Sequence, residues 1–223
     1  MYIWIVAADL LSGEEHPMQL KELSAATGVS AASIKFYLRE GLLPRGDEIH
    51  PTRAEYGPRH TERLELITGL RSVVGLRIDQ IRSLIGLIDD PAVTRLELLG
   101  RTQAMVLGAP PQTLPDLPLV RELLDAYSWP DVPTDARAVL NGTLREMEAM
   151  GLSVSADVVL GYARAADQVA KQDLGVVFDE KSRDRTVLAV AVGVRAYGKL
   201  LLSLVALAQA SRSIQRLGGE EST

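Results

Sequence analysis

A stretch near the N-terminus constrains the fold most, because two short amphipathic patterns meet at a glycine. The first, "MQLKELSAATG", places Leu20 and Leu23 on one face of a helix that ends before Gly28. The second, "SAASIKFYLREG", begins at Ser30, which suits an N-cap, and stops at Gly41. Two helices joined by a three-residue turn with glycine predict a helix-turn-helix unit.

The second of these helices has an unusual outer face. Its inward stripe is predicted to be Ile34 and Leu38, with Ala31 beside them. The opposite side carries Ala32, Lys35, Phe36 and Arg39, flanked by Ser33 and Tyr37. Helices that read the major groove have this composition, with cations for phosphate or guanine and an aromatic group for thymine. A partly covered aromatic ring between two solvated cations fits the same pattern equally well.

The residues that follow extend the unit. The segment "PRGDEIHPTRAEYGPRH" is rich in proline, glycine and charge, and it predicts a loop or a small β-hairpin wing. Two further helices are predicted in "RHTERLELITGLRSVVG" and "RIDQIRSLIGLIDDP", and Pro91 ends the second.

At this point the chain resembles the MerR-type transcription regulators over about residues 18 to 90. The residues that carry the resemblance are "ELSAATGVSAASIKFYLREGLLP", then Arg53 with "AEYGPRHTERLELI", then "GLRIDQIRSLI". The resemblance implies a homodimeric winged helix-turn-helix regulator that binds double-stranded promoter DNA at pseudo-palindromic sites. Members of this family often distort the promoter so that RNA polymerase can engage it.

The resemblance also implies which side chains contact DNA. The predicted DNA-binding residues are Ser33, Lys35, Phe36, Tyr37 and Arg39 on the second helix, and Arg53, Tyr56 and Arg59 at the wing. The chain departs from the family pattern at Ala32, Leu38 and Arg77, and these departures suggest a divergent operator.

The C-terminal part is predicted to be an all-helical bundle, because no strand alternation appears in it. The fold class is therefore mainly α, with the small wing as its β element. The predicted domains are an extension (1–17), the DNA-binding domain (18–90), a linking helix with a proline-rich linker (91–117), and a helical domain for effector binding and dimerisation (118–223). The extension is either a mis-assigned start or an extra helix.

Composition narrows the chemistry. The chain has no cysteine and only three histidines, all before residue 61, so we expect no metal site, no cofactor and no disulfide. This composition fits a reducing cytoplasm. The net charge of −5 is uneven: residues 18–88 hold ten Lys and Arg against eight Asp and Glu, and the remainder is acidic. A weakly basic reader with an acidic remainder is compatible with sequence-specific DNA binding.

The last predicted helix is long and apolar, but Arg195 and Lys199 interrupt it. They leave no uncharged run of about 18 residues, so we do not expect a membrane span. The two cations either pair with acids in a buried helix or anchor an anionic effector. The predicted effector-binding residues are Tyr127, Trp129, Tyr162, Arg195, Tyr197 and Lys199.

The sequence contains no pattern of catalytic residues, so we do not expect an enzyme. The favoured hypothesis is a DNA-binding regulator that responds to a small organic effector. Two alternatives stay open: an effector-free architectural DNA-binding protein of the excisionase type, and a ligand-sequestering helical protein.

Overall fold

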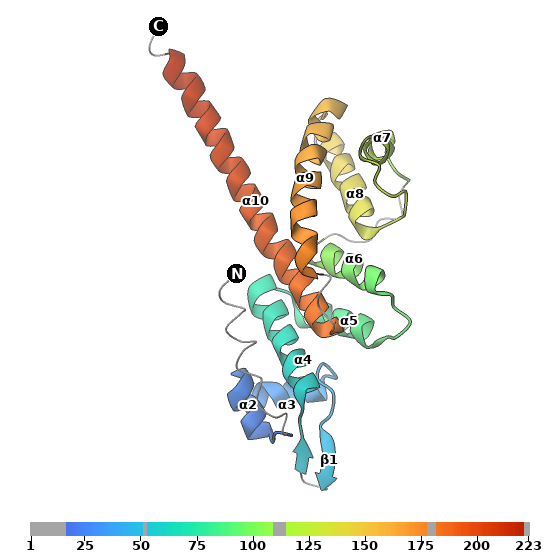
Figure 1. Cartoon of the computed structure of the whole chain (residues 1–223), viewed down its shortest axis with the longest axis vertical. Helices are drawn as coiled ribbons and strands as arrows, with labels where there is room; N and C mark the ends of the chain where they lie inside the picture. Colours follow the sequence, from blue (N-terminus) through green and yellow to red (C-terminus); the bar gives the residue numbers. More distant parts are fainter. Residues whose placement is uncertain (1–16, 51–52, 109–114, 178–181, 221–223) are drawn as a thin grey trace. The chain divides into compact units, whose positions relative to one another are not determined.

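The computed structural model describes residues 17–50, 53–108, 115–177 and 182–220 (Figure 1). The predicted extension lies almost wholly outside these residues. The fold is mainly α-helical with one small β-hairpin, which confirms the predicted class. The chain divides into two compact units, Met1–Thr68 and Gly69–Thr223. The predicted domain boundary after residue 90 followed the limits of the motifs, whereas the compact units separate earlier.

The first unit contains the predicted helix-turn-helix and wing. Its elements are α2 (Leu20–Thr27), α3 (Ala31–Arg39), β1 (Asp47–His50), β2 (Arg53–Glu55) and α4 (Pro58–Gly69), whose last residue belongs to the second unit.

The turn between α2 and α3 is fixed by local hydrogen bonds. Gly28 adopts the left-handed conformation, with φ of 68°, and ends α2. The Ser24 hydroxyl donates to the carbonyl of Val29 at 2.7 Å, which holds the turn against α2. The Ser30 hydroxyl accepts from the backbone N–H of Ser33 at 3.1 Å and caps α3, as predicted.

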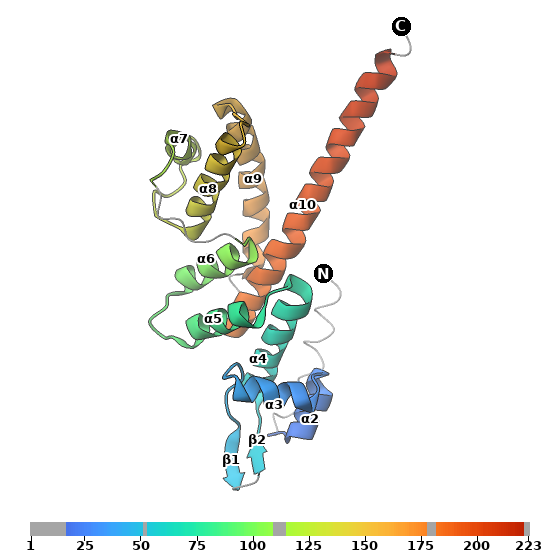
Figure 2. The ribbon, with the colours of Figure 1, turned by 180° about the vertical axis from the view of Figure 1, so that it is seen from behind.

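The wing is the antiparallel pair β1–β2, seen most clearly in Figure 2. Asp47 lies opposite Glu55 in its register. Met18 adds one further bridge, because its backbone exchanges two hydrogen bonds of 2.8 Å with Tyr56. The segment before α2 is thereby tied to the end of the wing.

The described residues of the second unit form helices and the loops that connect them, with no strand. Its elements are η2, a π-helix (Leu70–Val74), then α5 (Ile78–Asp89), α6 (Arg95–Val106), α7 (Pro118–Tyr127), α8 (Asp135–Ala149), α9 (Ala156–Val177) and α10 (Arg183–Glu220). In this unit α6 packs against both α10 and α8, and η2 packs against α10 and α5.

Arg183 fixes the start of α10. Its guanidinium donates to the carbonyls of Val93 at 2.9 Å, Leu87 at 2.7 Å and Asp90 at 3.2 Å. These carbonyls lie at the end of α5 and in the turn that follows, so one side chain satisfies three acceptors there.

A second anchor holds the chain that enters α7. The Asn141 amide is buried, accepts from the N–H of Leu117 at 2.8 Å, and donates to the carbonyl of Pro115 at 3.0 Å. One turn earlier on α8, Arg137 pairs with Asp116 and Asp131. Next to this anchor, Leu123 of α7 packs with Val159 and Ala163 of α9 in a small hydrophobic core.

Helix α10 changes character along its length. Val187, Leu188 and Ala191 near its start are buried, whereas its side chains from Tyr197 to Leu217 are exposed or nearly so. By length and composition alone, Arg183–Leu217 could cross a membrane, with a mean hydropathy of 1.7 in its most apolar window. One such helix is weak evidence for a span, and the charged Arg195 and Lys199 lie within it.

The close packing at the base of the wing predicts that position 46 must be glycine. A Cβ added at Gly46 would lie 2.7 Å from the carbonyl oxygen of Glu55, which is a backbone atom. We therefore expect Gly46→Ala to lower the free energy of unfolding by about 1–3 kcal/mol, measured by urea denaturation. Gly57→Ala is the matched control, because a Cβ there meets nothing within 4 Å. Equal free energies of unfolding for the two variants would contradict this requirement for glycine at position 46.

Candidate nucleic-acid interface

Two buried side chains orient α3. Ile34 is fully buried and Tyr37 is only 4% exposed, so the inward stripe runs through these residues. The prediction of Leu38 as the second inward residue is corrected, because Leu38 is only partly buried. Tyr37 and Leu38 lie three and four residues after Ile34, so both share its face of the helix. Of the two, the Tyr37 ring is the more deeply buried. The Tyr37 carbonyl then accepts the N–H groups of Leu42 and Leu43, which fold the chain back after α3.

The burial of Tyr37 bears on its predicted role. Its side chain is only 4% exposed, so the ring packs in the core, and a contact of Tyr37 with DNA stays a prediction. The Tyr37 ring supports the neighbouring Phe36, whose ring lies edge-on to it with centroids 5.6 Å apart.

The outer face of α3 presents the predicted cations. Ala32, Lys35 and Arg39 are exposed, and Phe36 between them is half-buried. The Arg39 guanidinium carbon lies 5.5 Å from the centre of the Phe36 ring, which is a cation–π arrangement. Helix α3 carries no acidic residue between Ala31 and Arg39, and Glu40, directly after it, pairs with the Arg39 guanidinium at 3.8 Å. The face therefore combines positive charge with one apolar ring that is held in place from both sides.

Ser33 lies at the N-terminal end of this face. Its hydroxyl is 2.9 Å from the hydroxyl of Ser30, and its backbone N–H donates to the same group. The hydroxyl can still accept a hydrogen bond while it forms part of the cap.

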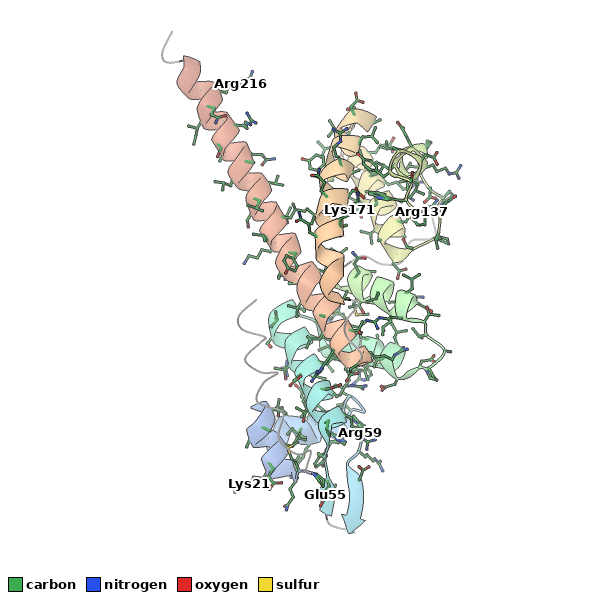
Figure 3. All side chains as sticks on the ribbon, viewed as in Figure 1. Lys21, Glu55, Arg59, Arg137, Lys171 and Arg216 are labelled. Carbon is green, nitrogen blue, oxygen red and sulfur yellow. The ribbon has the colours of Figure 1, made fainter. Side chains whose placement is uncertain are left out.

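The wing residues are placed differently from one another. Arg59, at the start of α4, donates to Asp47 on β1 at 2.9 Å, yet its side chain is 58% exposed. Figure 3 shows Arg59 beside the wing. Tyr56 is buried, with its ring edge-on to His60 at a centroid distance of 5.1 Å, and burial raises the pKa of its hydroxyl. Arg53 begins β2, and its side chain lies outside the described residues.

Two exposed cations and one buried hydrogen bond in this unit were not predicted from the sequence. Lys21 on α2, labelled in Figure 3, and Arg45 before β1 are both exposed. Arg45 also uses its carbonyl as a structural acceptor for the ring of His60, at 3.2 Å. The position of Arg45, directly after "GLLP", is the signal that could have identified it.

His60 joins the wing to α4. Its side chain is completely buried, and its Nδ1 accepts from the N–H of Gly57 at 2.9 Å. Because Nδ1 accepts, the hydrogen sits on Nε2 and donates to the carbonyl of Arg45. Burial lowers the pKa of His60, and the charge of Arg59 acts in the same direction, while the Arg45 carbonyl opposes it.

The predicted effector residues fall into separate groups within the second unit. Tyr127 and Trp129 stack with centroids 5.2 Å apart. The Tyr127 hydroxyl donates to the carbonyl of Leu160 at 2.8 Å, and the Trp129 indole donates to Asp167 at 3.2 Å. These two partly buried rings border the core of α7 and α9.

The other four effector candidates are exposed. Tyr162 lies on α9, whereas Arg195, Tyr197 and Lys199 lie on α10. Only the Tyr127–Trp129 pair is joined by a ring contact. Among the residues that the structure describes, no group of three or more His, Asp or Glu side chains is arranged to hold a metal.

The buried, neutral His60 makes stability depend on pH. The unfolded chain binds a proton below about pH 6.5, before the folded chain does, so stability falls as pH drops below that value. We expect urea denaturation, followed by circular dichroism from pH 8 to pH 5, to show a smaller loss of stability for His60→Gln than for the wild type. His16 and His50 are common to both proteins and cancel in the comparison. Parallel pH profiles would show that His60 is not the titrating group.

Comparison with known proteins shows what the N-terminal segment and the whole chain are similar to. Residues 18–86 match the family of MerR HTH regulatory proteins. A search of curated proteins found no match. A solved structure, that of the "putative transcriptional regulator SCO5550 from Streptomyces coelicolor A3(2)", is 28% identical, with a TM-score of 0.60 over 89% of this chain and 97% of that chain. The resemblance found in the sequence is thus confirmed, and residues 18–86 form a helix-turn-helix segment of the MerR type.

Proposed function

We propose that this chain is a sequence-specific, DNA-binding transcription regulator that acts as a homodimer and not as an enzyme. The outer face of α3, with Lys35 and Arg39 on either side of Phe36, is the observation that carries the proposal. The MerR-type match and the regulator named for the similar structure support it. Its partner is double-stranded promoter DNA in the cytoplasm, together with RNA polymerase acting at that promoter.

The chemistry of α3 suits a major-groove contact. Lys35 supplies a mobile charge for phosphate, which strengthens binding to any sequence. Phe36 supplies a surface for a thymine methyl group, and Arg39 stacked on that ring is held ready for phosphate or guanine. At the wing, Arg59 stays exposed while Asp47 fixes its direction, so it is available to a phosphate.

A homodimer is the assembly that such a site requires. One α3 reads only a few base pairs, and a two-fold pair of readers doubles the contacts on a pseudo-palindromic operator.

Three substitutions distinguish base-specific binding to DNA from non-specific electrostatic binding. With DNA from upstream of its own coding sequence, we expect Lys35→Ala to weaken binding to all sequences and to reduce the salt slope by about 1. Phe36→Ala should cost about 1–3 kcal/mol on the operator and little on unrelated DNA. Lys171→Ala is the matched control, an exposed lysine on α9 that pairs with Asp167. The measurement is fluorescence anisotropy over a salt series.

Other results would contradict the proposal that α3 contacts DNA. If Lys171→Ala weakened binding as much as Lys35→Ala, the contact would not lie on this helix. If Phe36→Ala lowered affinity equally for every DNA, Phe36 would support the fold instead of reading a base.

We further propose that the α7–α9 region binds a small, largely apolar organic effector at the Tyr127–Trp129 stack. The pair is only partly buried and borders an apolar core, while Asp167 supplies a polar group next to the indole. A second domain that binds an effector can change the DNA affinity of the dimer. The absence of cysteine disfavours a thiolate sensor.

Trp129 provides its own test of this site. The chain has two tryptophans, so Trp4→Phe leaves Trp129 as the sole fluorescent tryptophan. In a screen of apolar metabolites and drugs, we expect a ligand that changes Trp129 emission also to change operator affinity, by about 5–150-fold. Trp129→Leu should abolish the effect on affinity. If no compound alters DNA affinity, the α7–α9 region is only a scaffold.

A further inference from the structure

The wing carries more negative than positive charge. Its strands β1 and β2 hold Asp47, Glu48 and Glu55 against a single arginine, Arg53, and no lysine. DNA phosphates repel acidic side chains, and elements that lie against phosphates are usually rich in Lys and Arg. An acidic wing in the same unit as the basic face of α3 therefore needs a physical explanation.

Asp47 and Arg59 each lie where their immediate surroundings disfavour their charge. Asp47 is opposite Glu55 in the register of the wing, and like charges in directly opposed positions destabilise a β-hairpin. Arg59 is the second residue of α4, where the partial positive charge of the helix N-terminus disfavours a cation. The two side chains compensate one another, because the Arg59 Nη2 donates to the Asp47 Oδ1 at 2.9 Å.

This ion pair contributes little to the stability of the fold. The Arg59 side chain is 58% exposed and that of Asp47 is 79% exposed, so water screens their attraction. Figure 3 shows Arg59 beside the wing and Glu55 on it. Because stability gains so little from the pair, its effect on a binding partner of Arg59 is the better explanation for it.

The pair leaves part of the Arg59 guanidinium able to bind a second anion. Both of its contacts within the described part of the chain use Nη2, which donates to Asp47 and lies 3.5 Å from the carbonyl oxygen of Arg45. An arginine side chain has five N–H donors, so Nη1 and Nε keep donors of their own. A phosphate oxygen can therefore bind Arg59 while the contact with Asp47 is still made.

The effect of Asp47 depends on how closely the DNA approaches. In a loose complex with unrelated DNA, phosphates are held mainly by long-range attraction, and the charge of Asp47 cancels that of Arg59. When α3 lies in the major groove of an operator, a phosphate that touches Arg59 gains a short, charge-assisted hydrogen bond. This bond outweighs the repulsion from the more distant Asp47, because Coulomb energy falls with distance.

We propose that Asp47 is a specificity-determining residue for DNA binding. It is a positioning residue that acts through Arg59, and it lowers the affinity for unrelated DNA while it leaves operator affinity nearly unchanged. This inference rests on the proposed DNA-binding function and deepens it, since it names a residue that limits non-specific binding.

The substitution Asp47→Asn tests the proposal directly. Fluorescence anisotropy of the full chain over a salt series compares a duplex from upstream of its own coding sequence with a shuffled duplex of equal length. We expect Asp47→Asn to tighten binding to the shuffled duplex about fivefold, which is the effect of one unit charge at close range in water. Operator affinity should change by less than about twofold, and the salt slope on the shuffled duplex should steepen by about 1. Asp47→Glu, which keeps the charge, should behave like the wild type.

Two controls distinguish this ion pair from a change in net charge. Asp125→Asn removes the same charge at an exposed position on α7, and we expect it to leave both affinities unchanged. In an Arg59→Ala background, Asp47→Asn should no longer change the ratio of the two affinities, because no guanidinium remains for Asp47 to neutralise.

The other outcomes overturn the inference. Equal changes on the two duplexes, an equal effect of Asp125→Asn, or an effect that persists in the Arg59→Ala background would show that net charge alone acts. No change on either duplex, or weaker operator binding by Asp47→Asn, would make the pair only a structural contact. Lys35→Ala is measured on the same duplexes. A wild type that binds neither duplex at low salt contradicts the DNA-binding function and this inference together. Operator binding that Lys35→Ala weakens, with discrimination insensitive to Asp47→Asn, contradicts only the role of Asp47.

Discussion

The burial of Ile34 and Tyr37 decides what this protein can present to DNA. A nine-residue helix has little stability of its own, so its orientation comes from the side chains that it buries. Once these two side chains point inward, Lys35, Phe36 and Arg39 must point outward. The Tyr37 carbonyl then receives two amides and turns the chain toward the wing. The cap at Ser30, the cation–π pair and the position of the wing all depend on this choice of face.

Local signals in the sequence were sufficient where one residue decides the structure. Ser30 and Gly28 end or begin helices through their own backbone and hydroxyl groups, and both were predicted correctly. The inward stripe of α3 was only half right, because Tyr37 and Leu38 both fit the helical period after Ile34. Periodicity cannot choose between them, whereas packing against the rest of the unit can.

Contacts between residues far apart in the sequence were not predicted. The pairing of Arg59 with Asp47 spans the wing, and that of Trp129 with Asp167 joins the end of α7 to α9. Arg183 reaches three carbonyls about ninety residues away. No spacing rule predicts such contacts, because they follow from how whole helices pack. Yet Arg183 is what fixes the base of α10 on α5 and the following turn.

The central claim is that two copies of this chain present two α3 helices to one operator. Hydroxyl-radical footprinting on DNA from upstream of its own coding sequence, combined with the mass of the complex, tests this most directly. We expect two chains per duplex and two protected half-sites related by a two-fold axis, spaced by about 10 base pairs or a multiple of that. A single protected site with one bound chain, or no protection at all at low salt, would contradict it.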